Sequence, residues 1–418
     1  MMLFSLTPDG LQSMLHICYE YTRKNRYMYN ASKCKIVVYN DSKPKPNQQK
    51  LQWLIGRDIV EEAESYVHLG ITKDKYSTLN VNIDECCAKL RRTYFGLGET
   101  GLNSNTVHPL SIKRLYESVV LPKALYGCEV WNRLTSSQIL QLERAHRTCV
   151  KNIQSMPRHT RSDITLSCLA VYPLETYIDK RKLLFFGQLC RTNSDKNLKR
   201  LFIYRLFSFI NSPSDQIGFV PDLYRLFCKY SLKAVLEEFM ATSHFPNENA
   251  WKTAVRKAIH IHVCQEYKSR GGDTQLETFK TIHCDYSSSI LWVFSKIYSD
   301  QLLYCRSSMR VLCKFFGRRY TVTCHQCNIL TENIAAHSIL YCRKTDQYKQ
   351  QMWKHIYKCM GAKNYQQFVS LEPDEQMLEL LSGFVHISMN DMKRVSCFKI
   401  AVRYVHILGQ YRCNVLNI

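Results

Sequence analysis

The stretch TSSQILQLERAHRTCVKNIQS, residues 135–155, is the part of the chain that most clearly predicts its fold. At about 100° per residue, its apolar side chains gather on one side of a helix; these are Ile139, Leu142, Cys149, Val150 and Ile153. The basic side chains fall on the opposite side, with i, i+3, i+7 spacing; these are Arg144, Arg147 and Lys151. An amphipathic helix of this kind buries one face in a protein core. The basic face is either an ordinary solvated surface or a phosphate-contacting one.

The same helical period continues along most of the chain beyond Asn80. The patterned stretches cover 81–97, 107–127, 135–155, 173–193, 197–210, 222–240, 250–265, 288–303, 345–360 and 390–409. A mainly α fold is therefore predicted, with helical segments expected over 80–165 and 166–304. A last segment, 305–418, is expected to combine helices with a small module that carries cysteine and histidine.

The first 79 residues have a different pattern. Strands are expected at 1–6, 35–39, 51–55 and 65–71, where β-branched and aromatic residues gather. A polar loop interrupted by prolines is expected at 40–47. Thr7 and Pro8 are typical of a helix start, because threonine caps the first turn and proline already has a helical φ. Residues 1–79 are therefore predicted to form a small α+β piece.

The composition indicates a polyanionic partner. The chain has 57 Lys and Arg against 35 Asp and Glu, a formal net charge of +22. Nucleic acid is the commonest partner of such a protein, an anionic membrane surface is the next, and an uncommitted basic surface is the third reading. Nineteen cysteines without a secretory leader indicate reduced thiols, and hence a soluble intracellular protein of the nucleus or cytoplasm.

Five segments, in this order, resemble the reverse transcriptases of LINE-type (non-LTR) retrotransposons. They are MMLFSLTPDGLQ at 1–12, YNASKCK at 29–35, SYVHLGI at 65–71, PKALYGCEVW at 122–131 and LERAHR at 142–147. The resemblance implies that 1–79 is part of a polymerase palm, 80–165 a helical thumb and 166–304 a helical connector. It also implies that Lys33 or Lys35 lies near the incoming nucleotide, and that Leu69 and Gly70 support the primer end. Both lysines fit, and the sequence does not choose between them. With the resemblance, the basic face of 135–155 is expected to contact the nucleic-acid backbone through Arg144, Arg147 and Lys151.

The paired catalytic aspartates of that family do not occur in this chain. Two-metal phosphoryl transfer needs clustered carboxylates, so Mg²⁺ is expected only in a full-length enzyme. No residue of this chain is assigned a catalytic role. We expect a C-terminal portion of an RNA-directed DNA polymerase that binds RNA or DNA and is inactive without the catalytic segment.

A second candidate site is Cys324-His-Gln-Cys327, followed by His337 and Cys342. The C-x2-C-x9-H-x4-C spacing resembles a retroviral zinc knuckle with a longer central gap, and three thiolates with one imidazole complete a zinc tetrahedron. Cys305, Cys313 and His325 are competing ligands, and a cysteine-rich chain can also produce such spacing by chance. The neighbouring Arg318-Arg319-Tyr320 suits contact with phosphates and bases.

Two other functions fit the same residues. One is a stand-alone, zinc-dependent nucleic-acid-binding or scaffold protein derived from a retroelement. The other is a decayed reading frame without a selected function.

The resemblance makes a prediction about the gene. Genomic DNA just upstream of the Met1 codon should encode Tyr or Phe-x-Asp-Asp, in frame or separated by one frameshift or intron. Sequencing that region tests it, and unrelated sequence there would count against the family assignment.

Overall fold

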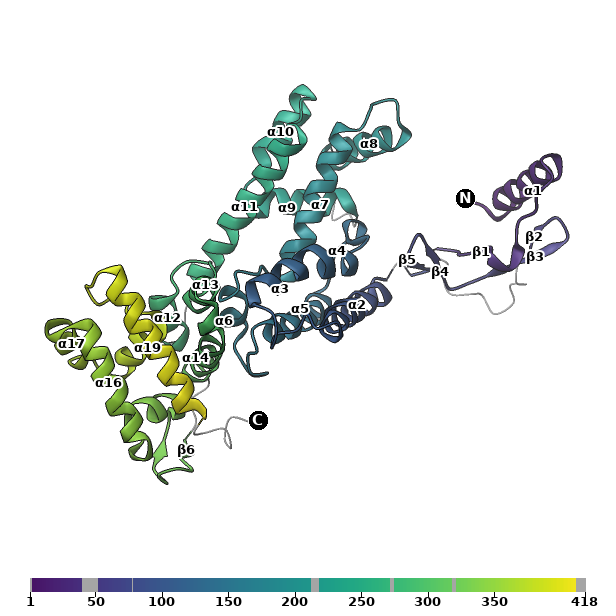
Figure 1. Ribbon diagram of the computed structural model, residues 1–418. Coiled ribbons are helices and arrows are strands. Elements are labelled where there is room, and N and C mark those ends of the chain that lie inside the picture. The colour runs from purple at the N-terminus through teal and green to yellow at the C-terminus, as the bar shows by residue number, and fades with distance from the viewer. Residues whose placement is uncertain are drawn as a thin grey trace. The chain divides into compact units, whose positions relative to one another are not determined.

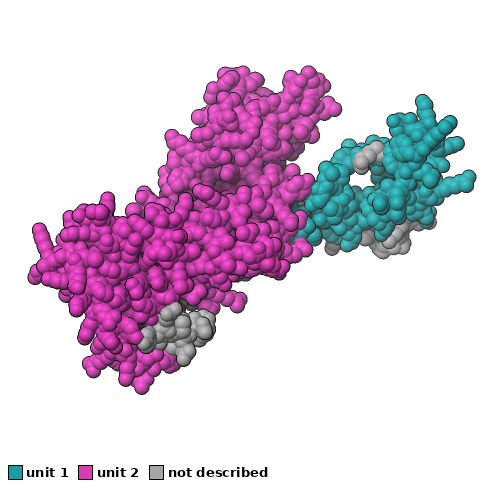
Figure 2. Space-filling view, viewed as in Figure 1, with its two compact units in different colours: residues 1–85 teal, residues 86–418 magenta. Residues whose placement is uncertain are grey.

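The computed structural model describes residues 2–39, 52–76, 78–211, 218–270, 274–317 and 321–410. The chain forms two compact units, residues 1–85 and 86–418 (Figure 2). Helices account for 67% of the residues and strands for 6%, which confirms the predicted mainly α class. The finer limits at residues 165 and 304 stay predictions.

The first unit begins with helix α1, Pro8–Lys24. The Thr7 hydroxyl accepts a hydrogen bond from the Gly10 N–H, and Pro8 occupies the first helical position, as predicted. The strand expected at 1–6 is wrong for residues 2–6, which pair with no other strand among the described residues. Phe4 and Leu6 are exposed, so apolar character alone did not produce a buried strand here.

A three-stranded sheet follows, in the order β1-β3-β2. Its strands are β1 (Lys35–Ile36), β2 (Trp53–Ile55) and β3 (Asp58–Glu62), with β1 parallel and β2 antiparallel to β3. The expected loop at 40–47 and Leu51 lie outside the described residues. The sequence analysis missed β3, because only Val60 of its five residues is buried and three of the others are acidic.

The small core of this unit lies between α1 and the sheet; it contains Leu15, Ile36, Trp53, Ile55 and Val60. The Gln12 side chain closes one sheet edge: its amide nitrogen donates to the Leu54 carbonyl at 2.8 Å and its oxygen accepts from the Leu54 N–H at 3.1 Å. Because a side chain satisfies this edge, the backbone there is not free to pair with another strand.

Residues 65–74 form a hairpin of β4 (Ser65–His68) and β5 (Ile71–Asp74). The strand expected over 65–71 therefore ends early, at a two-residue turn. Leu69 (φ +50°) and Gly70 (φ +77°) both adopt the left-handed conformation that such a turn requires. The Asn82 side chain bonds both the N–H and the carbonyl of Thr72, and so ties α2 to the hairpin.

Helices dominate the second unit (Figure 1). Helix α2 begins in the first unit. The helices are α2 (Asn80–Glu99), α3 (Pro109–Leu115), α4 (Leu121–Ala124), α5 (Ser136–Ile153), α6 (Ser162–Ser167), α7 (Leu174–Arg191), α8 (Asn197–Asn211), α9 (Phe219–Lys229), α10 (Lys233–Thr242), α11 (Glu248–Ser269), α12 (Thr274–Ile282), α13 (Ile290–Ile297), α14 (Leu302–Phe315), α15 (Ile334–Ala336), α16 (Asp346–Met360), α17 (Ala362–Val369), α18 (Pro373–Ser382) and α19 (Asp391–Gln410). The stretch predicted over 222–240 is two helices, because the chain breaks at Ser231, whose φ is +55°.

Helices α5, α7 and α11 build the centre of this unit. Helix α5 starts with a capping box of Thr135 and Gln138, and its predicted apolar stripe is confirmed, with Ile139 half-buried and the other four side chains buried. Helices α7 and α11 approach closely at Gly187, where a Cβ would lie 2.3 Å from the Trp251 ring. The Trp251 indole N–H donates to the Leu183 carbonyl, which fixes this crossing.

His146 on α5 is fully buried. One ring nitrogen lies 2.8 Å from the Tyr116 hydroxyl and the other 3.0 Å from the Tyr172 carbonyl oxygen. Burial lowers the pKa of His146 from 6.5 to about 4, so the ring is neutral at pH 7.

The fold should therefore lose stability in acid. Since the pKa of His146 is depressed in the folded state, unfolding takes up a proton between pH 6.5 and about 4, and stability falls as pH falls through that window. The neutral variant His146→Gln should reduce the pH 7 to pH 5 loss in unfolding free energy by about 2 kcal/mol. Urea titrations at the two pH values measure this difference. An unchanged pH dependence in the variant would show that other groups carry the acid sensitivity.

Candidate metal centre and basic surface

A short turn between two strands positions the first two ligands of the cysteine-histidine cluster. Strands β6 (Val322–Thr323) and β7 (Leu330–Thr331) pair antiparallel. Between them, the Cys324 N–H donates to the Ile329 carbonyl at 2.8 Å and the Asn328 N–H donates to the Cys324 carbonyl at 2.7 Å. Asn328 takes a φ of +57°, which asparagine tolerates better than most residues. The turn holds the Cys324 and Cys327 sulfurs on the same side.

A helical segment supplies the other two ligands. Asn333 caps α15 through its side chain, which accepts from the Ala336 N–H, and its carbonyl accepts from the His337 N–H. His337 begins a π-helical turn, η5 (His337–Tyr341), and the Cys342 N–H donates back to the His337 carbonyl at 2.8 Å. This turn brings the His337 and Cys342 side chains, which are separated by four residues, to the same side, facing the Cys324–Cys327 turn.

The four predicted ligands come together. Their ligand atoms all lie within 4.8 Å of one another. The Cys324 and Cys342 sulfurs are 4.0 Å apart, and the Cys327 sulfur is 3.2 Å from the His337 Nε2 atom. Zinc–sulfur bonds of about 2.3 Å in a tetrahedron place two sulfurs roughly 3.8 Å apart. The chemistry and spacing of these donors therefore fit a structural zinc site.

Burial of the cluster agrees with that role. Cys324, His337 and Cys342 are at most 4% exposed, and Cys327 is half-buried. Burial raises the pKa of the Cys342 thiol, so a cation that favours the thiolate would offset a real desolvation cost. The competing ligands Cys305 and Cys313 lie on α14, outside the cluster, and His325 is exposed.

The cluster is built into a helical bundle. Its elements α15 and η5 contact α14, α18 and α19, and α16 packs along α19 (Figure 1). Trp353 on α16 packs against Phe368, with ring centroids 5.6 Å apart, which favours a packing role for this aromatic side chain. Arg318-Arg319-Tyr320 lies outside the described residues.

The two candidate nucleotide-binding lysines lie in different settings. Lys35, on β1, forms an ion pair with Glu61 of the neighbouring β3, and this pair lowers the pKa of the Glu61 carboxyl. Lys33 is exposed at the end of the short helix η1 (Ala31–Lys33) and has no ion-pair partner within the described ranges. Lys33 is therefore the lysine whose charge is available to a ligand.

Leu69 and Gly70 form the exposed tip of the β4–β5 hairpin. The turn geometry itself requires a residue such as glycine at position 70, so a close approach of nucleic acid is not needed to explain it. Leucine at position 69 is unusual, because a bulky residue in the left-handed region is strained. Its side chain is 75% exposed, so packing does not explain its presence.

The predicted basic stripe of α5 divides into two kinds of side chain. Arg144 is exposed. Arg147 donates to the Glu143 carbonyl and the Ser162 hydroxyl, and the Lys151 ammonium donates to the Arg158 carbonyl at 2.7 Å. Arg147 and Lys151 are half-buried and hold the segment that follows the helix, which the sequence pattern did not indicate.

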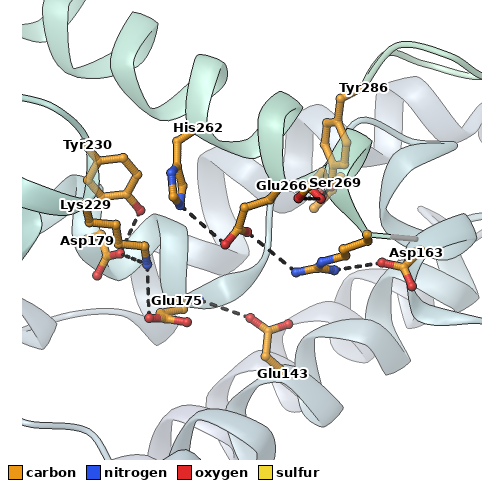
Figure 3. A network of polar contacts seen from close by, with 12 residues as sticks. Glu143, Asp163, Glu175, Asp179, Lys229, Tyr230, His262, Glu266, Ser269 and Tyr286 are labelled. Atoms are coloured by element: carbon orange, nitrogen blue, oxygen red, sulfur yellow. Dashed lines mark hydrogen bonds and ion pairs between the residues drawn. The ribbon is translucent and has the colours of Figure 1, made fainter. Parts of the chain in front are cut away.

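The sequence analysis also missed a network of acidic side chains on α5, α6, α7 and α11 (Figure 3). Lys229 bridges Glu175 and Asp179, and Arg270 bridges Asp163 and Glu266. Glu143 accepts from the Glu175 N–H, although burial raises its pKa. Cations or backbone N–H groups engage these carboxylates, so the arrangement is that of a structural ion-pair network. No sequence signal could have found it, because its members are far apart in the chain.

Comparison with known protein families, with curated proteins and with solved structures finds no match. Among the described helices, none has the length and apolar character needed to cross a membrane.

The cluster predicts one tightly bound zinc ion per chain. Cys327→Ser should abolish stoichiometric zinc, measured by elemental analysis of purified protein. It should also lower the melting temperature, because structural zinc sites contribute directly to folding free energy. The exposed Cys284→Ser serves as the matched control and should retain the metal. Equal zinc content in both variants would show that Cys327 does not bind the metal and would contradict the proposed site.

Proposed function

We propose that this chain is the nucleic-acid-handling portion of a LINE-type reverse transcriptase, and that it binds RNA or DNA. The observation that carries the proposal is the buried Cys3His cluster in a chain of net charge +22. Small zinc modules of this type and an excess of basic side chains are both common in nucleic-acid-binding proteins.

The order of segments supports the assignment to this family. In the proposal, residues 1–79 belong to a palm, with Lys33 at the nucleotide and the Leu69-Gly70 hairpin at the primer end. Residues 80–165 act as a thumb, in which α5 presents Arg144 to the partner. The exposed, strained Leu69 is compatible with a contact of this kind, because strained residues persist where a function retains them.

The proposed role is to bind and orient a polynucleotide. Zinc would be held by Cys324, Cys327, His337 and Cys342, and it would stabilise the fold of the C-terminal helices. Phosphodiester formation would require Mg²⁺ on paired aspartates, and this sequence contains no Asp-Asp pair. In a full-length enzyme the activity would be RNA-directed DNA synthesis.

The second candidate is a stand-alone zinc-dependent nucleic-acid-binding or scaffold protein. The packing of the cysteine-histidine elements against α14, α18 and α19 favours it, because the metal then serves a larger bundle. A marked preference for primed template over unprimed strands would support the polymerase portion. Equal affinity for both would support the stand-alone binder.

Binding to nucleic acid should weaken steeply as salt rises. Each phosphate contact lowers the slope of log binding constant against log salt by about 0.9 on duplex DNA and about 0.7 on single strands. Fluorescence anisotropy with labelled RNA and DNA between 50 and 200 mM salt measures that slope. Binding that is independent of salt, or absent at the lowest salt, would contradict the proposed function.

A further inference from the structure

Five basic residues lie on α5, on the segment 154–162 that follows it, and on α14, which contacts that segment. We call this group the basic platform; its members are Arg144, Arg147, Lys151, Arg158 and Arg310. Arg144, Arg147 and Lys151 lie along α5, and Lys151 bonds the Arg158 carbonyl. Arg310 on α14 donates from its Nε atom to the Ser155 carbonyl at 3.4 Å. The platform therefore joins α5 and the segment that follows it to α14, which is distant in sequence.

The segment that carries Arg158 is held firmly. Ser155 turns the chain with a φ of +54°, and the Thr160 hydroxyl donates to the Pro157 carbonyl at 2.8 Å. At the start of the segment, Gln154 donates to the Thr165 carbonyl and accepts from the Trp292 indole N–H. The guanidinium groups are thus presented from a preorganised backbone, which reduces the entropy cost of binding a ligand.

None of the five side chains has an ion-pair partner in the part of the chain that the structure describes. Two acids of this region have other partners. Glu143 accepts from the N–H of Glu175, although Arg147 also interacts with it electrostatically, and Asp163 pairs with Arg270. Arg147 is close enough to Lys151 to lower the pKa of that ammonium, in addition to the larger effect of burial. Five cations and few acids leave an excess of positive charge in this region, so an anionic ligand would be favoured here.

We infer that the basic platform is the surface on which this protein holds the phosphodiester backbone of a nucleic acid. The inference rests on the proposed function and specifies where the partner binds. Arginines form most of the platform, and their planar fork matches phosphate oxygens. From Arg144 to Lys151 the helix rises about 10 Å, which spans roughly three phosphates of one strand along a duplex.

An anionic membrane is the competing partner. A basic helix that lies on a bilayer inserts its apolar face among the lipids. Helix α5 instead buries that face within the protein, through Leu142, Cys149 and Val150. The platform therefore presents positive charge without an exposed apolar face that could insert into a bilayer. Such a surface suits a phosphate backbone better than a membrane.

The test removes two charges without disturbing the scaffold. Arg144 and Arg158 are exposed, and their guanidinium groups make no hydrogen bond within the described residues. The double variant Arg144→Gln/Arg158→Gln, in the full zinc-loaded chain, should bind a 30-base-pair duplex about 25-fold more weakly at 0.15 M salt. The salt slope should become shallower by about 2, because two phosphate contacts are lost.

A matched control removes the same charge elsewhere. Arg200 and Arg205 are exposed on α8, and Arg200→Gln/Arg205→Gln should change affinity less than twofold. Arg144→Lys/Arg158→Lys should restore most of the binding, since the charge is retained. Unchanged circular dichroism and zinc content in all variants exclude misfolding.

Each other outcome overturns the inference in a distinguishable way. Equal losses in platform and control variants would mean that net charge alone drives binding. Tight binding that the platform variant retains would leave the proposed function standing and remove the platform. A wild-type chain that does not bind the duplex would contradict both the proposed function and the platform. Platform-dependent binding to phosphatidylserine vesicles, without binding to the duplex, would assign the surface to a membrane.

Discussion

The distribution of a large positive charge is the constraint on which this molecule depends. With 57 basic and 35 acidic side chains, acids are in short supply. The interior of the second unit uses several of them. Asp222 forms an ion pair with Lys182, and both side chains are under 10% exposed. Asp179 forms an ion pair with Lys229 and accepts a hydrogen bond from the Tyr230 hydroxyl. A buried charge that lost its partner would be strongly destabilising. These carboxylates must therefore stay paired with interior cations and cannot neutralise cations at the surface.

Because these acids pair with interior cations, the surface is left with an excess of basic side chains. Where α5 meets the segment that follows it, Arg147, Lys151 and Arg310 bond backbone carbonyls and a serine hydroxyl, and none of them forms an ion pair within the described residues. The same side chains thus have two roles. Arg147 and Lys151 shape the backbone, and Arg144 and Arg158 carry charge to the solvent. A polyanionic ligand would supply the countercharge that the chain itself does not provide at this place.

The cysteine-histidine cluster has a different structural role in the second unit. Its two strands, β6 and β7, are only two residues long and could not hold a fold together by pairing alone. Four ligands that converge from a turn and a helical segment make a metal the natural cross-link. Because their helical elements pack on α14, α18 and α19, the cross-link would reach well beyond the module itself.

The sequence by itself determined the helical class, the apolar stripe of α5, the start of α1 and the four candidate metal ligands. Each of these depends on local periodicity, capping or spacing, which short-range geometry controls. It failed where tertiary contacts decide: residues 2–6 form no strand, β3 was missed, and Lys151 holds a backbone carbonyl. Only the folded chain brings Arg310 to the end of α5 and Lys229 to Asp179, because no local pattern encodes which distant side chains will meet.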